Sequence, residues 1–446
     1  MRNNKLMTWF SLIFLAVFLL GCSVLSAKEP PLMPALELES RSIPPAWMVV
    51  SAQRLDFDRP PNTNPFGYGQ AIALGDGVLA VGAPARMGPG LDDPGRVYVF
   101  RQGPAGWDLE IELGASDRDD GFQYTQQFGS ALAIQDGFLY VGAPAADDPL
   151  VGDNTGAVYI FEDAPGGWVE IGKLTSPEPV ANGNFGTMLA LHGSHLAAAE
   201  GQIYDHNRIR LFRGAGADWQ HTTVVAASEM LDSQGGIMEF DLYGDTLSVV
   251  KSYFSGEGSF TEPQGWVEIY DFDGAMWNKT AQLPSQAEAA GEQVFIAQRI
   301  ALDGRDGIAN RLAIGAPMSR TSGFMSGAVY LYAREGGTWR FDAVLAAPDE
   351  STSAGMLSGF GTVALRGDML LVGAPGTSED SFLDGVAYLY QYVDGYWYTQ
   401  LRLTHAEDGG FGDFFGSSGA IHGDTLLIAA PSEYGQTAYV FEIGDR

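Results

Sequence analysis

The chain has 446 residues, of which 58 are Gly and 23 are Pro, and 46% of its residues are hydrophobic. This mixture of turn-forming and apolar residues favours many short strands over long helices. Acidic residues outnumber basic ones by 55 to 25, for a formal net charge of −30. Such a surface repels phosphates and anionic lipid headgroups, so we exclude nucleic acid as a partner. The negative charge either keeps the surface solvated or, alternatively, binds a basic partner.

The N-terminus has the pattern of an export signal. Arg2 and Lys5 precede an apolar stretch over 6–20, and Gly21 and Cys22 follow it. This pattern resembles a bacterial lipoprotein signal, in which residues 1–21 are removed and Cys22 is acylated. An uncleaved membrane anchor over 6–27 is the alternative. Cys22 is the only cysteine, which excludes a disulfide within the chain.

Residues 22–45 form the next segment. They include five prolines, at positions 30, 31, 34, 44 and 45. A segment of this composition is typical of an extended tether without a core of its own. With either form of the N-terminus, the body of the chain over 46–446 is expected outside the cytoplasm. For a lipoprotein, Ser23 after the cysteine resembles sorting to the outer membrane in a bacterium with two membranes.

From residue 46 onward one phrase recurs. Residues 128–144 are FGSALAIQDGFLYVGAP, and the tripeptide GAP begins at positions 82, 142, 315 and 373. Less similar copies are AEG from 199, VKS from 250 and AAP from 429. These seven corners lie about 58 residues apart and define seven units. Units three, four and five keep the least of the phrase.

Each unit contains four short apolar stretches, which we interpret as four strands. In the second unit, Asp136 and Gly137 join the first two stretches as a tight hairpin turn. The stretches are apolar on both faces, so each four-stranded antiparallel sheet must lie between neighbouring sheets. The sequence therefore predicts an all-β fold, a seven-bladed β-propeller.

The two ends of the repeat region predict how the ring closes. In six units a Trp follows the last aromatic residue of the third strand by seven positions, as Trp168 follows Phe161. The seventh unit ends its third strand at Phe441, and no fourth strand follows before Arg446. A spare copy, WMVVSAQRL, occupies residues 47–55. We expect this N-terminal strand to complete the C-terminal blade and remove a free sheet edge.

The recurring FG and GAP segments, with GAVYIF and a following Trp, resemble the FG-GAP repeat family, which includes the seven-bladed head of integrin α chains. The resemblance covers residues 47–446 and implies the same propeller. Some integrin-like blades bind calcium in an acidic loop between strands one and two. Here those turns are too short, and only Leu302–Arg311 has the length, with Arg305 and Gly307 where carboxylates are expected. We therefore predict no metal and no cofactor. Acidic loops such as Asp147, Asp148 and Asp153, or Asp117, Asp119 and Asp120, are interpreted as solvated charge, with weak ion binding as the alternative.

The sequence shows no catalytic motif. It lacks a nucleophile elbow, a phosphate loop and zinc-binding histidine spacing. Arg366-Gly367-Asp368 resembles an integrin-recognition tripeptide, but it falls in a predicted hairpin turn, where Gly and Asp serve the backbone. We expect a non-enzymatic protein. A glycan-active enzyme using a carboxylate pair remains an alternative.

The remaining candidate is a binding surface on one rim of the propeller. The loops between strands two and three, with the crossovers between blades, vary most in length, as binding loops on a rigid scaffold do. The predicted ligand-binding residues lie on the loops of units three and four and are Tyr204, Asp205, His206, Tyr253, Phe254 and Phe260. Packing of these aromatic residues within a degenerate blade is the alternative. We expect a monomeric, lipid-anchored propeller that binds a protein or glycan, or alternatively a structural spacer or assembly factor of a membrane complex.

Overall fold

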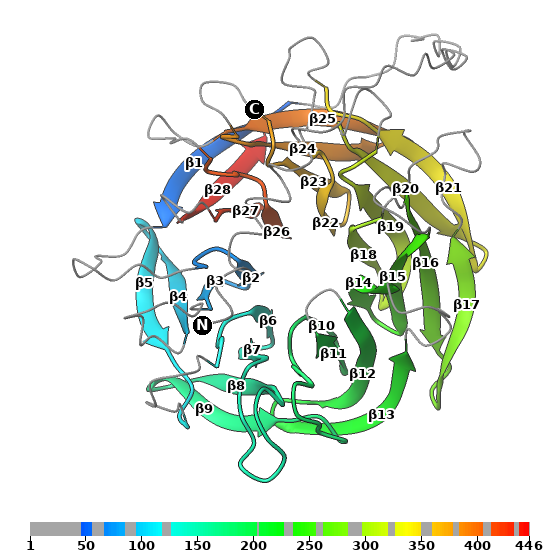
Figure 1. Ribbon diagram of the computed structural model, residues 1–446. Helices are drawn as coiled ribbons and strands as arrows, with labels where there is room; N and C mark the ends of the chain where they lie inside the picture. Colours follow the sequence, from blue (N-terminus) through cyan, green and yellow to red (C-terminus); the bar gives the residue numbers. More distant parts are fainter. Residues whose placement is uncertain are drawn as a thin grey trace, which may run out of the picture. The chain divides into compact units, whose positions relative to one another are not determined.

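The protein is a ring of β-sheets in the computed structural model, which describes residues 46–55, 67–84, 95–117, 126–202, 205–226, 235–255, 262–283, 297–319, 326–348, 359–377, 383–404, 412–431 and 437–445. All these residues lie within one compact unit, 44–446. They form 28 strands, arranged as seven blades around a central axis (Figure 1). The predicted seven-bladed propeller with four antiparallel strands per blade is confirmed. The described residues contain no helix that is long and apolar enough to cross a membrane.

The strands follow the predicted repeat. Those of blades one to three are β2 (Ala71–Gly75), β3 (Val78–Ala83), β4 (Arg96–Gly103), β5 (Gly106–Leu113), β6 (Ala131–Gln135), β7 (Phe138–Ala143), β8 (Ala157–Ala164), β9 (Gly167–Leu174), β10 (Leu189–His192), β11 (His195–Gln202), β12 (Asp205–Ala215) and β13 (Asp218–Ala226). Those of blades four and five are β14 (Gly235–Tyr243), β15 (Thr246–Ser255), β16 (Glu262–Phe272), β17 (Trp277–Leu283), β18 (Arg299–Arg305), β19 (Ile308–Ala316), β20 (Ala328–Glu335) and β21 (Thr338–Leu345). Those of blades six and seven are β22 (Thr362–Arg366), β23 (Met369–Ala374), β24 (Val386–Val393), β25 (Tyr396–Leu403), β26 (Ser418–His422), β27 (Thr425–Ala430), β28 (Thr437–Asp445) and β1 (Trp47–Leu55).

Closure of the ring follows the prediction. β1 is the outermost strand of blade seven, in the order β1-β28-β27-β26, and Trp47 pairs with Asp445 while Leu55 pairs with Ala438. Figure 1 shows this blue strand beside the red C-terminal strand. Because β28 ends beside the hairpins that join strands three and four, β1 begins at that same rim. We call it the turn rim, and we call the opposite rim, with the two-to-three connections and the crossovers, the loop rim.

Side chains of β1 also connect blade seven to both neighbouring blades. The side-chain amide of Gln53 donates to the carbonyl of Trp107 at 2.6 Å and accepts the Trp107 amide at 2.8 Å. On the other side, the amide of Trp47 donates to Gln400 at 3.1 Å. Leu55 is 1% exposed and packs with the core between blades seven and one. The first strand therefore joins three blades, not one.

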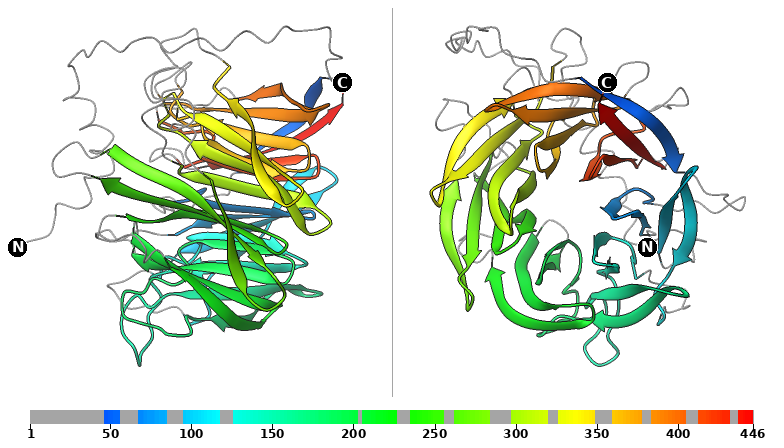
Figure 2. Two further views of the ribbon diagram at one scale, coloured as in Figure 1. Left: turned by 90° about the vertical axis from the view of Figure 1, so that its right-hand side faces the viewer. Right: turned by 180° about the vertical axis from the view of Figure 1, so that it is seen from behind.

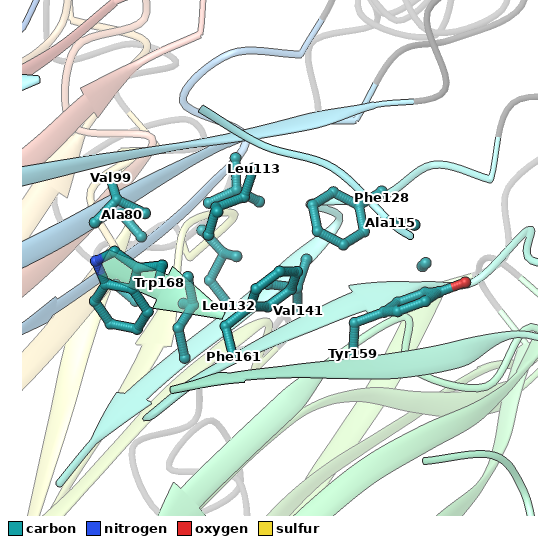
Figure 3. Packing of buried hydrophobic residues seen from close by; sticks show 14 of the residues in the cluster. Ala80, Val99, Leu113, Ala115, Phe128, Leu132, Val141, Tyr159, Phe161 and Trp168 are labelled. Carbon is teal, nitrogen blue, oxygen red and sulfur yellow. The ribbon is translucent and has the colours of Figure 1, made fainter. Parts of the chain in front are cut away.

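The recurring phrase forms the contacts between blades. In the core between blades one and two, Phe128 is fully buried and meets the rings of Tyr159 and Phe161 edge to face, with centroids 5.6 and 6.0 Å apart (Figure 3). Val99 and Leu113 from blade one pack into the same cluster. In blades two, three, six and seven the aromatic residue of FG is buried in the core against the preceding blade.

The two glycines of the phrase meet across this interface. A Cβ on Gly82, from the GAP corner of blade one, would lie 2.1 Å from the carbonyl oxygen of Gly129, from the FG segment of blade two. Gly129 also has a φ of +94°, a conformation that side chains disfavour. The same close approach recurs between Gly142 and Gly186, Gly315 and Gly361, and Gly373 and Gly416. FG and GAP are thus the two sides of one backbone contact.

Candidate functional site

The loop rim of blades three and four differs from the rest of the ring. In five blades the second strand ends at the Ala of GAP and a Pro follows, which cannot donate to the ladder. Blades three and four lack that Pro, and their second strands continue to Gln202 and Ser255. Their third strands, β12 and β16, have 11 residues each, against 8 in blades one, two, five and six. Figure 2 shows these green strands reaching beyond the others in the side view.

The same two blades are joined into one eight-stranded sheet. The backbone of His206 on β12 pairs with Ile237 on β14, and Gly235 on β14 pairs with Tyr253 on β15. We predicted separate sheets, but the long strands bring the edges of these blades into hydrogen-bonding reach. This pairing brings together the backbones of Asp205, His206, Tyr253 and Phe254 at the loop rim. Tyr204, Phe260 and Cys22 lie outside the described residues.

Beneath this rim lies a buried ion pair in blade three. Glu200 occupies the place of the GAP alanine, and Arg210 occupies the place of the tyrosine that the third strand carries in five blades. Each is only 2% exposed. The Arg210 guanidinium donates to Glu200 at 2.5 Å and to Glu178 at 3.2 Å, and Ser176 donates to Glu200 at 3.1 Å. Burial opposes the charge of Arg210, but these carboxylates outweigh it and raise its pKa.

Blade four has the same substitution with the charges reversed. Lys251 stands at the GAP alanine and Glu268 at the tyrosine, with Nζ 2.7 Å from the carboxylate, and both are 2% exposed. Lys279, Tyr270 and Trp266 also donate to Glu268, at 2.6, 2.5 and 3.1 Å. Burial acts to raise the pKa of Glu268, but these donors more than offset it and lower the pKa to about 2. The carboxylate is fully ionised and satisfied.

These four charged residues were not among the predicted site residues. The signal for them lies in the sequence, because AEG and VKS replace GAP in the same units in which Arg and Glu replace the third-strand tyrosine. The two substitutions in each blade can be recognised as a pair only from the strand register, which places Ala198 opposite Arg210 and Val249 opposite Glu268. The acidic or basic residue then lies on the diagonal from its partner, within reach of a long side chain.

A row of carboxylates bridges the innermost strands of blades four and five. Glu239 and Asp241 on β14 accept the backbone amides of Ile300 and Leu302 on β18, at 2.8 and 2.7 Å. Burial raises the pKa of each carboxyl to about 7, although those amides, and Arg299 beside Glu239, act in the opposite direction. Both carboxyls are therefore partly protonated near neutral pH, and both are engaged with backbone donors.

The turn rim carries contacts between successive blades. Gln135 accepts the amide of Gly193 at 2.7 Å, His192 accepts the amide of Gly244 at 2.9 Å, and Asp303 accepts the amide of Gly367 at 2.5 Å. Gln135 and His192 are the last residues of the first strands of their blades, and Asp303 lies two residues before the end of β18; each bonds to the hairpin of the next blade. His422 reaches Asp76 in the same way. His192 and His422, the last residues of β10 and β26, thus contact the following blade.

Two motifs noted in the sequence also lie on this rim. Leu302–Arg311 does not form an open loop, because Asp306 and Gly307 make a tight turn between β18 and β19. Arg366-Gly367-Asp368 closes the hairpin of β22 and β23, and Asp368 pairs with Arg311 at 2.7 Å. Among the described residues there is no group of three or more His, Cys, Asp or Glu that could hold a metal ion.

Comparison with known proteins agrees with this architecture. The model of the FG-GAP repeat matches residues 107–161 and 397–441. Two segments of this propeller, one spanning blades one and two and the other blades six and seven, are therefore similar to the FG-GAP repeat. A segment of 94 residues is 38% identical to mouse phosphatidylinositol-glycan-specific phospholipase D, and 96 residues are 40% identical to the human protein of that name. Each match covers 20% of this chain and only 11% of the relative.

Solved β-propellers are similar in outline. The β-propeller domain of the Trilobed protease from Pyrococcus furiosus aligns with 84% of this chain and 96% of its own chain, at 9% identity and a TM-score of 0.44. The N-terminal domain of Nup159 aligns with 89% of this chain and 95% of its own, at 9% identity and a TM-score of 0.43. At these values the likeness carries no argument about function.

The buried pair of blade three leads to a stability prediction. Arg210→Ala leaves Glu200 buried without its cation, and we expect this to cost about 3 to 5 kcal/mol of unfolding free energy. The double variant Glu200→Ala with Arg210→Tyr restores the residues of the other blades and should regain most of that loss. Denaturant unfolding measures both, with Arg340→Ala as the control because the Arg340–Glu335 pair is exposed. A cost for Arg210→Ala as small as the control's contradicts the assigned role.

The carboxylates of β14 lead to a pH prediction. Their folded pKa values of about 7 exceed the ordinary 4.5 and 3.8, so folding takes up protons. Their stabilising contribution is complete below about pH 4 and is lost as the pH rises through 7. Between pH 5.5 and pH 8, the unfolding free energy of Glu239→Gln with Asp241→Asn should therefore rise relative to that of the wild type by on the order of 4 kcal/mol, about 2 kcal/mol for each carboxyl. Parallel pH profiles for the two proteins contradict the prediction.

Proposed function

We propose that this chain is a non-enzymatic, lipid-anchored binding protein outside the cytoplasm, and that its loop rim engages a protein or glycan. One observation carries the proposal. Blades three and four extend their strands past the loop rim and replace two core pairs by buried ion pairs, while the other five blades keep the repeat. A local departure of this kind on an otherwise regular scaffold is typical of a recognition surface.

The position of β1 is compatible with a binding surface on the loop rim. Trp47 enters the ring at the turn rim, because it pairs with Asp445 at the end of β28. The described chain therefore enters the propeller at the turn rim, and the proposed recognition surface lies on the opposite rim of the ring.

The chemistry of the described carboxylates supports a binding role. A glycan-cleaving pair requires one carboxylate that can donate a proton and another that is free to attack or to activate water. Glu239 and Asp241 have suitably raised pKa values, but both already accept backbone amides of β18. The phospholipase relatives share only a short segment with this chain, so we do not extend their activity to it. The propeller itself supports a binding or structural role.

The lipid anchor is tested at Cys22. When the full chain is produced in its host with labelled palmitate, we expect the label on the wild-type protein. Cys22→Ser should lose the label and leave the membrane fraction, because no other thiol is present in the chain. If Cys22→Ser retains the membrane association without label, the N-terminal segment is an uncleaved anchor instead.

The recognition surface is tested by photo-crosslinking in intact cells. A crosslinking residue at position 253 or 254, on the loop rim, should capture a soluble protein or a glycan conjugate. The same residue at Met276, which is 58% exposed on the turn rim, should not capture it. Stoichiometric capture of one membrane assembly through both rims contradicts the proposal and favours the structural spacer.

A further inference from the structure

The loop rim of blade two carries a protruding apolar tip. We define the blade-two tip as residues 147–154, between β7 and β8, with residues 180–184 of the crossover that follows β9 (Figure 1, lower edge). Leu150 is 95% exposed, Val180 is 51% exposed and Val151 is 37% exposed. The two segments touch, since a Cβ on Gly152 would lie 3.1 Å from the Cβ of Ala181.

Hydrogen bonds fix the first segment of the tip. Asp147 accepts the amide of Asn154 at 2.7 Å, and Asp148 accepts the amide of Leu150 at 2.8 Å. The backbones of Asp148 and Gly152 exchange two hydrogen bonds, of 3.1 and 2.8 Å. Leu150 therefore stands on a closed, hydrogen-bonded turn.

The second segment is held equally firmly. The amide of Asn182 donates to the carbonyl of Asp153 at 2.8 Å, and the Asn154 side chain donates to that of Asn182 at 3.1 Å. The amide of Gly201 on β11 donates to Gly183 at 2.7 Å, which ties the tip to blade three. A surface ordered before binding loses little conformational entropy on association, so its apolar side chains contribute more of their burial to affinity.

The charges around the tip indicate the kind of partner. Asp147 and Asp153 are exposed beside the apolar side chains, as is Glu178, which also accepts from the buried Arg210; residues 145–156 and 175–186 contain no Lys or Arg. An acidic border is repelled by anionic lipid and by the same surface on a second copy of this chain. It complements a protein surface on which Lys or Arg side chains surround an apolar socket.

We propose that the blade-two tip inserts Leu150, with Val151 and Val180, into an apolar socket bordered by Lys or Arg on a partner protein. Leu150 is the central contact, because it is the most exposed of the three and its docking would remove the most apolar surface from water. This proposal rests on the loop-rim function above and names the class of partner and the blade that binds it.

The test uses the full chain in its own host cells. A photo-crosslinking residue at position 150 or 180 should capture the same protein, whereas one at Met276 should not. That protein is then purified, and its dissociation constant is measured for the wild type, Leu150→Ser and Met276→Ser. We expect Leu150→Ser to weaken binding at least about tenfold and Met276→Ser to leave it unchanged. Binding should also weaken as salt rises from about 50 to about 500 mM.

Several outcomes overturn the proposal. If Leu150→Ser binds the captured protein as tightly as the wild type does, Leu150 does not insert into an apolar socket. If the protein crosslinks to itself and light scattering gives a doubled mass, the tip binds a second copy of this chain. If the protein floats with phosphatidylcholine vesicles and Leu150→Ser abolishes the flotation, the tip binds a membrane. Capture from position 253 but not from 150 overturns this inference and leaves the loop-rim function standing. Capture from neither position overturns both.

Discussion

The ring depends on the pairing of its two ends. β28 alone would leave blade seven with three strands and an open edge, and β1 supplies the fourth strand while also bonding to Trp107 and Gln400 in the neighbouring blades. A closed ring has no free inner face, so every blade can be apolar on both sides. The runs of apolar residues in each strand follow from that closure, and so does the assignment of the two rims.

Within the ring, the recurring phrase encodes the contacts between blades. The glycines of GAP and FG meet backbone to backbone, and the aromatic residue before the FG glycine closes the core beside them. Where the phrase is lost, both sides of the contact change together. Ala199 packs in the core that holds Ile237, and Val250 in the core that holds Ala297, at places that carry Gly in blades one, two, five and six. The degenerate units are therefore altered interfaces rather than random decay of the repeat.

Much of the fold was predictable because each blade repeats the same local problem. The Asp136-Gly137 turn, the prolines after GAP, and the Trp seven positions beyond the last aromatic residue of the third strand all reflect interactions between residues close together in the sequence. The surplus strand at 47–55 was predictable because the last unit lacked one. What could not be predicted depends on long-range register. The bridge between His206 and Ile237, and the diagonals that join Glu200 to Arg210 and Lys251 to Glu268, require knowing which strands face each other.

The candidate site shows the same division. Length variation identified the loop rim of units three and four, and the structure brings the backbones of Asp205, His206, Tyr253 and Phe254 into one sheet there. The buried charges below them were missed, since an isolated Glu or Lys in a strand resembles a surface residue until its partner is located. The blade-two tip was noted only as acidic loop charge. Its apolar character depends on the exposure of Leu150 and Val180, which the sequence does not show.

Hydrogen exchange of the native full-length chain, followed by mass spectrometry, tests the closure of the ring most directly. The account predicts that a peptide covering residues 47–55 exchanges as slowly as one covering β28, because the two strands share a hydrogen-bonded ladder and open together. Exchange of 47–55 at the rate of an unstructured peptide, while β28 and the other blades stay protected, would contradict it.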